Sequence, residues 1–329
     1  MWKIGNVEIK NQIVAAPLAG ISNPVYRQCM HEYGAGLVVS EMISDKALHY
    51  QNQRTFDMCA TSKYEHPVSL QLFGSDPSTM GEAAAYLTEH TDCDIIDINM
   101  GCPVPKVIKA NAGSWLLTHP EEADKAIRAV VSHTNRPVTV KIRAGWDFQH
   151  INCVEMAQLI EKAGASAIAV HGRTKSQLYT GQSNNEYIKM VKESVSIPVI
   201  GNGDIKTVAD AKRMLSETNC DAIMIGRGLL GRPFFLTELN CALNGQEYSE
   251  PSYEQRLEMC EEYAHRLCEF EGEHTAIPMM RGMAGWYLTG MPYASSYKNQ
   301  LTQVNSLDEL KQILDTYRKG LSQLEKSAL

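Results

Sequence analysis

The chain has 329 residues, which is enough for one large domain of about 250 residues and a smaller appended one. It is 44% hydrophobic and 21% charged, without the run of about 18 apolar residues that spans a bilayer and without a signal-peptide pattern, so we expect a cytoplasmic protein with no membrane contact. The net charge of −7 gives no whole-chain argument for nucleic-acid binding, so an RNA partner would need a local basic patch.

Short apolar segments rich in β-branched residues alternate with helix-type segments from the N-terminus onward. Helices are expected at 24–33, from Pro77 to about residue 90 with Asp76 as N-cap, and at 120–133. The eight expected strands cover 14–17, 36–40, 67–73, 93–98, 137–142, 165–170, 197–200 and 221–225. This alternation predicts an α/β fold of the (β/α)8 TIM-barrel type. A doubly wound open sheet is the alternative; it is disfavoured because the first strand-to-helix turn lacks GxGxxG and because polar residues follow nearly all eight strands.

The composition changes near residue 243. A polar link containing Pro251 follows, and no strand pattern appears after it. The spacing of apolar residues predicts three or four amphipathic helices in this part of the chain. We therefore expect a barrel domain at 1–242 and a small helical bundle at 243–329.

One strand end carries a thiol. Residues 93–98 form an apolar run typical of a strand buried on both faces, and Asn99, Gly101 and Pro103 end it. Cys102 therefore falls in a loop at the edge where parallel α/β folds bind ligands, although a free Cys packed as a small hydrophobic residue is the alternative. The nine cysteines are odd in number and form no CxxC pair, which indicates reduced thiols and no metal site.

Polar residues at several strand ends indicate a flat, partly anionic ligand, and a flavin mononucleotide (FMN) fits. Its phosphate would lie at the loops after the last two strands, where the sequences GNGD (201–204) and GRG (226–228) allow backbone amides to approach and Arg227 adds charge. The polar residues that end strands three to seven are Gln71, Asn99, Cys102, Lys141, His171 and Asn202.

Two of these residues have an alternative interpretation. Lys141 lies within an apolar strand, where it would either pair with an acid such as Asp97 or stabilise negative charge on a reduced flavin; we favour the second. His171 is either a core histidine or a ligand, and the sequence does not decide between them.

Several motifs together resemble the tRNA-dihydrouridine synthases, particularly the bacterial B-type branch. The likeness is continuous over 10–240 and looser in the C-terminal helices. The motifs are APLAG (16–20, with Leu18 where the family usually has Met), QLFG (71–74), DINMGCP (97–103), AGSWLL (112–117), VKIRAGWD (140–147), VHGRT (170–174), GNGDI (201–205) and MIGRGLLGRPF (224–234).

The resemblance implies an FMN enzyme that reduces the C5=C6 bond of uridine in folded RNA, with tRNA as the expected substrate and NADPH as the electron donor. Cys102 would be the proton donor to C5, and a thiol is mostly protonated at neutral pH. Asn99 would bind the target base, and Arg143 and Arg173 would contact RNA. The residues that would contact FMN are Pro17, Leu18, Ala19, Gln71, Lys141, His171, Asn202, Gly203, Asp204, Gly226 and Arg227.

The charge of the C-terminal part bears on how RNA would bind. Residues 243–329 contain 13 Asp or Glu and eight Lys or Arg, with the acids concentrated before residue 274. We therefore expect RNA to lie across the later helices, including Arg281 and Lys298, and the barrel mouth, with Lys106 and Lys109 nearby. An ordinary solvated helix surface is the alternative.

Other functions remain open from the sequence. A small-molecule FMN dehydrogenase or ene-reductase of the dihydroorotate type would share the barrel, the flavin and the strand-end Lys, but it would not require a helical tail. A dihydrouridine synthase acting on ribosomal RNA is a second alternative, and a non-catalytic RNA-binding factor on a retired barrel is a third, disfavoured by Cys102 and Lys141. We expect a monomer.

Overall fold

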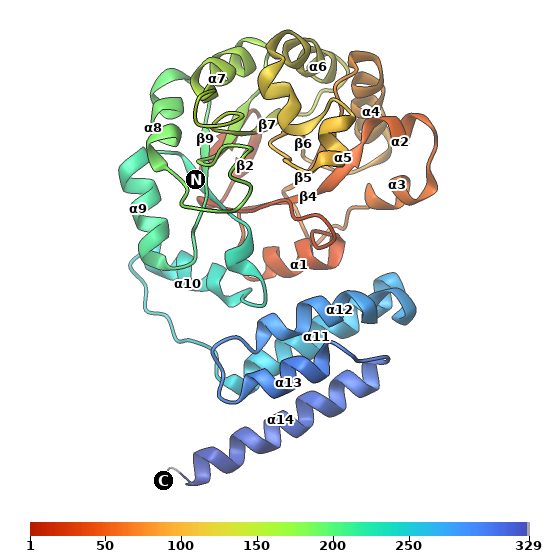
Figure 1. Cartoon of the computed structure of the whole chain (residues 1–329), viewed down its shortest axis with the longest axis vertical. Coiled ribbons are helices and arrows are strands. Elements are labelled where there is room, and N and C mark those ends of the chain that lie inside the picture. Colours follow the sequence, from red (N-terminus) through yellow and green to blue (C-terminus); the bar gives the residue numbers. More distant parts are fainter. Residues whose placement is uncertain (328–329) are drawn as a thin grey trace. The chain divides into compact units, whose positions relative to one another are not determined.

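The structure is a computed structural model that describes residues 1–327, with side chains described up to residue 323 (Figure 1). The chain divides into two compact units, Met1–Gly228 and Leu229–Leu329. Among residues 1–327, no helix is both long enough and apolar enough to cross a bilayer.

The first unit is a closed barrel of eight parallel strands, in the order β10-β3-β4-β5-β6-β7-β8-β9. The barrel closes where Ile223 N–H donates to Gln12 O and Ala16 N–H donates to Ile225 O. The strands are β3 (Ile13–Ala15), β4 (Leu37–Ser44), β5 (Val68–Phe73), β6 (Ile95–Met100), β7 (Val138–Arg143), β8 (Ala167–His171), β9 (Val199–Asn202) and β10 (Ala222–Ile225). The predicted (β/α)8 barrel is confirmed, and each of the eight predicted strands overlaps an observed one.

Helices alternate with these strands in the chain (Figure 1). The predicted helix starts are confirmed, since Asn23 caps α1 through Tyr26 N–H and Asp76 caps α4, each with Pro at the first helical position. The main helices of this unit are α1 (Pro24–Glu32), α4 (Pro77–His90), α6 (Pro120–Ser132), α7 (Cys153–Lys162), α8 (Asn185–Ser194) and α9 (Val208–Thr218). Shorter ones are α2 (Asp45–His49), α3 (Gln53–Met58), α5 (Pro105–Lys109), η1 (Gly113–Thr118) and η2 (Arg227–Leu229).

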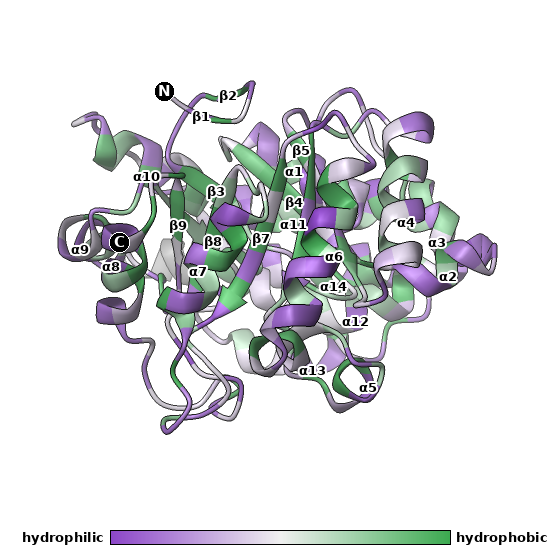
Figure 2. Cartoon of the chain, turned by 90° about the horizontal axis from the view of Figure 1, so that it is seen from above, coloured by the Kyte–Doolittle hydropathy of each residue, from purple (hydrophilic) through white to green (hydrophobic). Residues whose placement is uncertain are grey.

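An N-terminal hairpin packs onto the barrel core. Its strands, β1 (Trp2–Ile4) and β2 (Val7–Ile9), pair antiparallel around a turn that contains Gly5 at φ +56°. Ile4 and Ile9 are fully buried in a cluster with interior residues of the barrel, among them Val14 and Leu37. Figure 2 shows β3 and β9 largely in the colour of hydrophobic residues, as expected for parallel strands buried on both faces.

The second unit is helical, as predicted. Its helices are α10 (Phe234–Leu243), α11 (Tyr253–Glu271), α12 (Glu273–Tyr287), α13 (Ala294–Leu301) and α14 (Leu307–Ser327). Within this unit α11 packs against α12 and α14, and α13 packs against α12 and α14. The domain boundary was expected between 242 and 243, at the end of α10, whereas the two compact units divide after Gly228, so α10 belongs to the helical unit. The assignment of 243–329 as an RNA-binding domain stays a prediction.

Candidate active site

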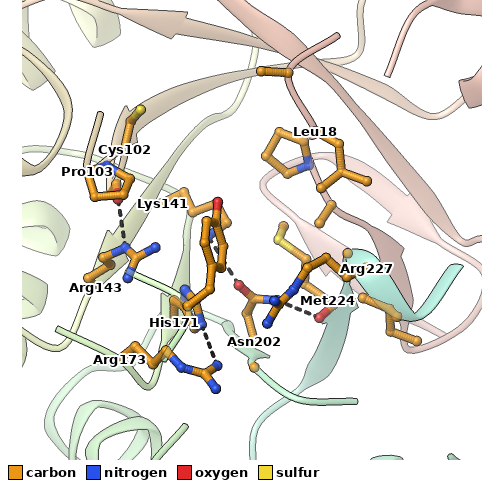
Figure 3. Close-up of a pocket in the computed structure, with 18 of the residues that line it drawn as sticks. Leu18, Cys102, Pro103, Lys141, Arg143, His171, Arg173, Asn202, Met224 and Arg227 are labelled. Carbon is orange, nitrogen blue, oxygen red and sulfur yellow. Dashed lines mark hydrogen bonds between the residues drawn. The ribbon is translucent and has the colours of Figure 1, made fainter. Parts of the chain in front are cut away.

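The carboxyl ends of the barrel strands surround one cavity, and every residue predicted as the proton donor, a cofactor contact or a contact of the target nucleotide lines it. Figure 3 draws part of this lining. Cys102 and Arg227 lie on opposite sides of the cavity in this view, with Lys141 and His171 between them. The predicted residues that line it are Pro17, Leu18, Ala19, Gln71, Asn99, Cys102, Lys141, Arg143, His171, Arg173, Asn202, Gly203, Asp204, Gly226 and Arg227. Their assignment to cofactor, substrate or proton transfer is not decided by this proximity and stays a prediction.

Asn99, at the end of β6, holds the loop that carries the thiol. Its Oδ1 accepts from the backbone N–H groups of Gly101 (3.2 Å) and Cys102 (2.8 Å). Its Nδ2 donates to Gln71 Oε1 (2.8 Å). Because these bonds use most of the capacity of the amide, one Nδ2 hydrogen is left for the predicted contact with a base.

Cys102 is buried, with 8% of the residue exposed, beside the apolar side chains of Val107 and Ala112. Burial raises the pKa of its thiol, against the opposing effects of a backbone hydrogen bond from Val104 and the charges of Arg143 and Lys141. The thiol is therefore protonated at neutral pH, as a group that donates a proton must be.

Lys141 projects from β7 next to Asn99 in register. Its Nζ donates to Asn202 Oδ1 (3.2 Å), and Asn202 Nδ2 in turn donates to Met224 O (2.8 Å). Burial and the neighbouring Arg143 lower the pKa of Lys141 to about 8, although Asp97 and Cys102 act in the opposite direction. Below that pH the ammonium is a cation in the wall of the cavity.

His171 is the last residue of β8, and Arg173 lies two residues later, in the loop that follows. Burial, followed by the charges of Lys141, Arg143 and Arg173, lowers the pKa of His171 far below its usual range, so the imidazole is neutral. Its Nε2 lies 3.4 Å from Arg173 Nη1, which can only donate, so Nε2 is the acceptor and the proton is on Nδ1. His171 is thus a neutral group that lines the cavity.

Arg173 is 2% exposed and is bound within the protein. Its guanidinium pairs with Asp204 Oδ2 (2.7 Å) and donates to the carbonyls of Thr180 (3.1 Å) and Gly181 (2.6 Å). Burial alone would raise the pKa of Asp204, but hydrogen bonds from Arg173 and from the backbone N–H of Ser183 hold it below its usual value. The pair ties the loop after β8 to the loop after β9.

Arg143 is also buried, with 3% of the residue exposed. Its Nε donates to Gly101 O, and its Nη1 donates to Thr174 O and Leu178 O, each at 2.8 Å. These bonds connect the loop of Cys102 to the loop after β8. The geometry therefore favours a bracing role for Arg143, and its predicted contact with RNA stays a prediction.

The charge and shape of the cavity fit an anionic ligand such as FMN. Among the described residues that line it, one is acidic, Asp204, and five are cationic: Lys141, Arg143, Arg173, Lys206 and Arg227. A Cβ added at Gly226 would make ordinary van der Waals contacts, 3.5 Å to Leu18 Cδ2 and 3.6 Å to Ala16 Cβ, and without it the backbone of this lining residue can be approached closely by a ligand. Backbone amides and the partly exposed Arg227 suit a phosphate. The apolar wall suits a flat ring.

The sequence did not predict Tyr179 as a site residue. Its side chain lines the cavity and is 56% exposed, with its ring centre 4.8 Å from Arg227 Cζ and 5.6 Å from Arg143 Cζ. An aromatic residue in the loop after a barrel strand was the available signal. Met42 and Val104 also line the cavity and were not predicted.

Comparisons with known proteins place the chain in a family. A family model described as Dihydrouridine synthase (Dus) matches residues 13–322. The chain belongs to the dihydrouridine synthase family. This match and the relatives below confirm the predicted family, its B-type branch and the expectation of an oxidoreductase.

The similarity to curated dihydrouridine synthases extends over most of each chain. The "Probable tRNA-dihydrouridine synthase" of Rickettsia bellii is 37% identical over 307 residues, 93% of this chain and 94% of its own length. The "tRNA-dihydrouridine synthase B" of Vibrio vulnificus is 39% identical over 305 residues, 92% of this chain and 94% of its own. The protein of the same name from Vibrio parahaemolyticus is 39% identical over 317 residues, which are 96% of this chain and 98% of its own length.

Solved structures resemble the barrel at low sequence identity. The crystal structure of TcOYE with pHBA has a TM-score of 0.53 at 14% identity and covers 78% of this chain and 94% of that one. Histamine dehydrogenase from Rhizobium sp. 4-9 has a TM-score of 0.52 at 14% identity, covering 73% and 47%. At this identity the likeness concerns the fold alone.

Proposed function

We propose that this dihydrouridine synthase reduces the C5=C6 bond of a uridine in tRNA to give 5,6-dihydrouridine, with FMN as cofactor and NADPH as electron donor. The observation that carries the proposal is a buried, protonated Cys102 thiol at the edge of a cationic cavity in the barrel mouth. Relatives whose alignments cover more than nine-tenths of the chain are named for tRNA, which supports that substrate. We expect it to act as a monomer.

The residues that would hold FMN are those of the cavity walls. Arg227 and the turns at Gly203 and Gly226 would bind the phosphate, while Gln71 and Lys141 would contact the ring. When bound, FMN would accept hydride from NADPH and supply it to C6 of the uracil.

The chain itself supplies the proton and the electrostatic setting. Cys102 Sγ–H donates its proton to C5, where hydride addition at C6 leaves carbanion-like, enolate-type charge. The ammonium of Lys141 stabilises that negative charge while it is protonated. Neutral His171 adds an N–H donor without introducing a further positive charge into the cavity.

RNA would meet the cavity through basic groups outside it, and the described contacts limit which ones are available. Arg281 Nε donates to Val304 O (2.8 Å) and its Nη2 to Asn305 Oδ1 (3.0 Å), while Lys298 Nζ donates to Thr289 Oγ1 (3.1 Å). Lys298 is half-buried and makes one side-chain bond, to a hydroxyl, whereas the guanidinium of Arg281 is held at two atoms, so Lys298 is the better candidate for a phosphate contact. We propose that it contacts RNA and that Arg281 supports the adjacent turn.

The experiment that tests the proposed function uses purified protein and cells. The protein should be yellow and release FMN on denaturation, and with NADPH it should form dihydrouridine in unmodified tRNA. Total tRNA and ribosomal RNA from cells lacking the gene should be mapped for dihydrouridine, with loss expected in tRNA. A colourless protein that FMN does not reconstitute would contradict the cofactor. Loss confined to ribosomal RNA would contradict the substrate, and activity on free pyrimidines or enones without activity on RNA would favour a small-molecule reductase.

A further inference from the structure

A chain of side-chain hydrogen bonds leads from β7 to the loop that carries Cys102. Thr139 Oγ1 donates to Asp97 Oδ1 (2.5 Å), and Gln71 Nε2 donates to Asp97 Oδ2 (2.6 Å). Asn99 Nδ2 donates to Gln71 Oε1 (2.8 Å), and Asn99 Oδ1 accepts from the backbone N–H of Cys102 (2.8 Å). Each of these residues is buried, Asp97 with 4% exposed and Gln71 with none.

The strand register explains why these groups meet. Gln71 on β5 lies beside Asp97 on β6, which lies beside Thr139 on β7, so the three side chains occupy one level of the barrel. Asn99 is two residues beyond Asp97 on the same strand and therefore lies on the same face, one level nearer the cavity. The contacts are thus a consequence of sheet geometry and do not depend on a flexible loop.

The order of donors and acceptors in this chain is fixed at Asp97. A carboxamide presents either its oxygen or its NH₂ group when it rotates by 180°, but Asp97 Oδ2, which faces Gln71, accepts whether the carboxyl group is ionised or carries a proton on Oδ1, toward Thr139. Gln71 must therefore turn its NH₂ group to Asp97 and its oxygen to Asn99, which in turn leaves Asn99 Oδ1 for the N–H of Cys102. Burial raises the pKa of Asp97, while hydrogen bonds from Thr139 and Gln71 and the charge of Lys141 oppose that change.

We propose that Asp97 is a positioning residue, which sets the orientation of the Gln71 and Asn99 amides and through them holds the loop that presents the Cys102 thiol. The role rests on the proposed function in that Cys102 is taken as the proton donor. Asp97 does not line the cavity and is not a catalytic residue in this scheme.

The direct readout is hydrogen exchange of the Gly101 and Cys102 amides, measured by mass spectrometry on a peptide covering 98–104. In Asp97→Asn, the new side-chain amide can donate to Gln71 as well as accept from it. The side-chain amides of Gln71 and Asn99 can therefore rotate by 180°, and Asn99 Oδ1 no longer faces the backbone N–H groups of Gly101 and Cys102 all of the time. We expect exchange to be about tenfold faster than in the wild type, because this factor corresponds to the loss of about one hydrogen bond. Unchanged exchange would overturn the proposal.

Ser69→Ala is the matched control. Ser69 lies on β5 two residues before Gln71 and is 1% exposed, and its Oγ finds no hydrogen-bond partner among the described residues. This variant removes a buried hydroxyl from the same strand without touching the chain of amides. It should leave exchange at Gly101 and Cys102 at the wild-type rate; faster exchange here as well would show that any change in the barrel interior loosens the loop, and would overturn the proposal.

A rescue variant separates orientation from mere loss of structure. In Asp97→Asn with Gln71→Glu, the new carboxamide donates to the new carboxylate, which also accepts from Asn99 Nδ2, so Asn99 Oδ1 again faces the N–H of Cys102. We expect slow exchange to return. Exchange as fast as in Asp97→Asn, in a double variant with the wild-type melting temperature, would overturn the proposal.

A double-mutant cycle gives the same test if the rescue variant does not fold. Gln71→Met interrupts the chain between Asp97 and Asn99, so adding Asp97→Asn to it should produce no further change in exchange at Gly101 and Cys102. An equal effect of Asp97→Asn with and without Gln71→Met would overturn the proposal.

The readout also separates this inference from the proposed function. Hydrogen exchange is measured without RNA, so altered exchange in Asp97→Asn together with a wild-type protein that forms no dihydrouridine would support the positioning role and contradict the function. Unaltered exchange in Asp97→Asn, together with a wild-type protein that forms dihydrouridine, would support the function and contradict the positioning role. Where both hold, Asp97→Asn should slow uridine reduction about tenfold, and should slow it more than it slows flavin reduction by NADPH.

Discussion

The two sides of the cavity are held by different kinds of interaction. On the side of β5 and β6, neutral amides position the thiol, as Gln71 bonds Asn99 and Asn99 bonds the N–H of Cys102. On the side of β8 to β10, an ion pair between buried Arg173 and partly exposed Asp204 ties two loops together near Arg227. The thiol side is organised mainly by the direction of amide dipoles, with Arg143 bracing Gly101 O, and the other side is organised by charge.

The difference matters because a thiol and an anion have opposite requirements. Cations close to a cysteine stabilise the thiolate, which would leave no proton to donate. Positioning through amides avoids that effect, and burial keeps the pKa of Cys102 raised despite Arg143 and Lys141. A phosphate, in contrast, needs cations and backbone amides, and these are grouped around Asp204 and Arg227.

The largest effect, on the rate of uridine reduction, is expected from removing the thiol itself. Cys102→Ala removes the proton donor, and we expect uridine reduction to fall about 10²- to 10⁴-fold, the usual contribution of a general acid. FMN binding and flavin reduction by NADPH should be retained, because they do not use this proton. The measurement is dihydrouridine yield against NADPH oxidation; an unchanged yield would show that another group or water supplies the proton.

A smaller effect, on stability, is expected from breaking the charged side. Asp204→Asn leaves the buried guanidinium of Arg173 without its counter-charge, and because Asp204 is itself partly exposed we expect a loss of about 2 kcal/mol in the free energy of unfolding, below that of a fully buried pair. The pKa of Asp204 is lowered in the folded state, so its contribution is present at neutral pH and is lost as the pH falls through that lowered value.

Denaturant unfolding at pH 7 and near pH 3 measures both parts of this prediction. The difference between wild type and Asp204→Asn should shrink at the lower pH. Asp124→Asn is the control, since Asp124 pairs with a half-exposed Arg128 on α6, and an exposed pair of this kind contributes little to stability. Equal losses in the two variants would contradict the special role of the buried pair.

Within the charged side, Arg227 should affect ligand binding more than folding. Its side chain is 47% exposed, and we propose that it contacts the FMN phosphate, so Arg227→Ala should weaken FMN binding about tenfold, the lower end for a charged hydrogen bond. Flavin fluorescence titration measures the Kd, with Arg128→Ala as a control for loss of one exposed Arg. Wild-type affinity in Arg227→Ala would place the phosphate elsewhere.

The sequence predicted the barrel and the members of the site because both are encoded locally. Each strand is an apolar run, and a residue such as Asn99 or a Gly-rich turn marks its end, which in this fold is the edge of the cavity. The N-terminal hairpin was missed, since its strands have three residues each and the Gly5-Asn6 turn was the only strong signal.

The state of the arginines could not be predicted in the same way. Arg143 and Arg173 were expected to contact RNA, yet both are buried and donate mainly to backbone carbonyls of the loop after β8. Every residue has a carbonyl, so such a partner leaves no mark in the sequence. The order of donors and acceptors from Asp97 to Cys102 could not be predicted from the sequence either, because it depends on the register of three strands.

The smallest expected effect concerns Lys141, which lies between the two sides of the cavity. Its pKa is lowered to about 8 by burial and by Arg143, so the side chain is an ammonium below that pH and a neutral amine above it. FMN affinity should therefore fall, by less than tenfold, as the pH rises from 7 to 9, because a cation that attracts the anionic ligand is lost. Bound FMN stabilises the ammonium, so the midpoint in the complex should be higher than in the free protein. Lys141→Met should bind more weakly at pH 7 and show no such change between pH 7 and 9. A wild-type affinity that is constant over this range would mean that Lys141 stays charged, and that Asp97 and Cys102 outweigh the effect of burial.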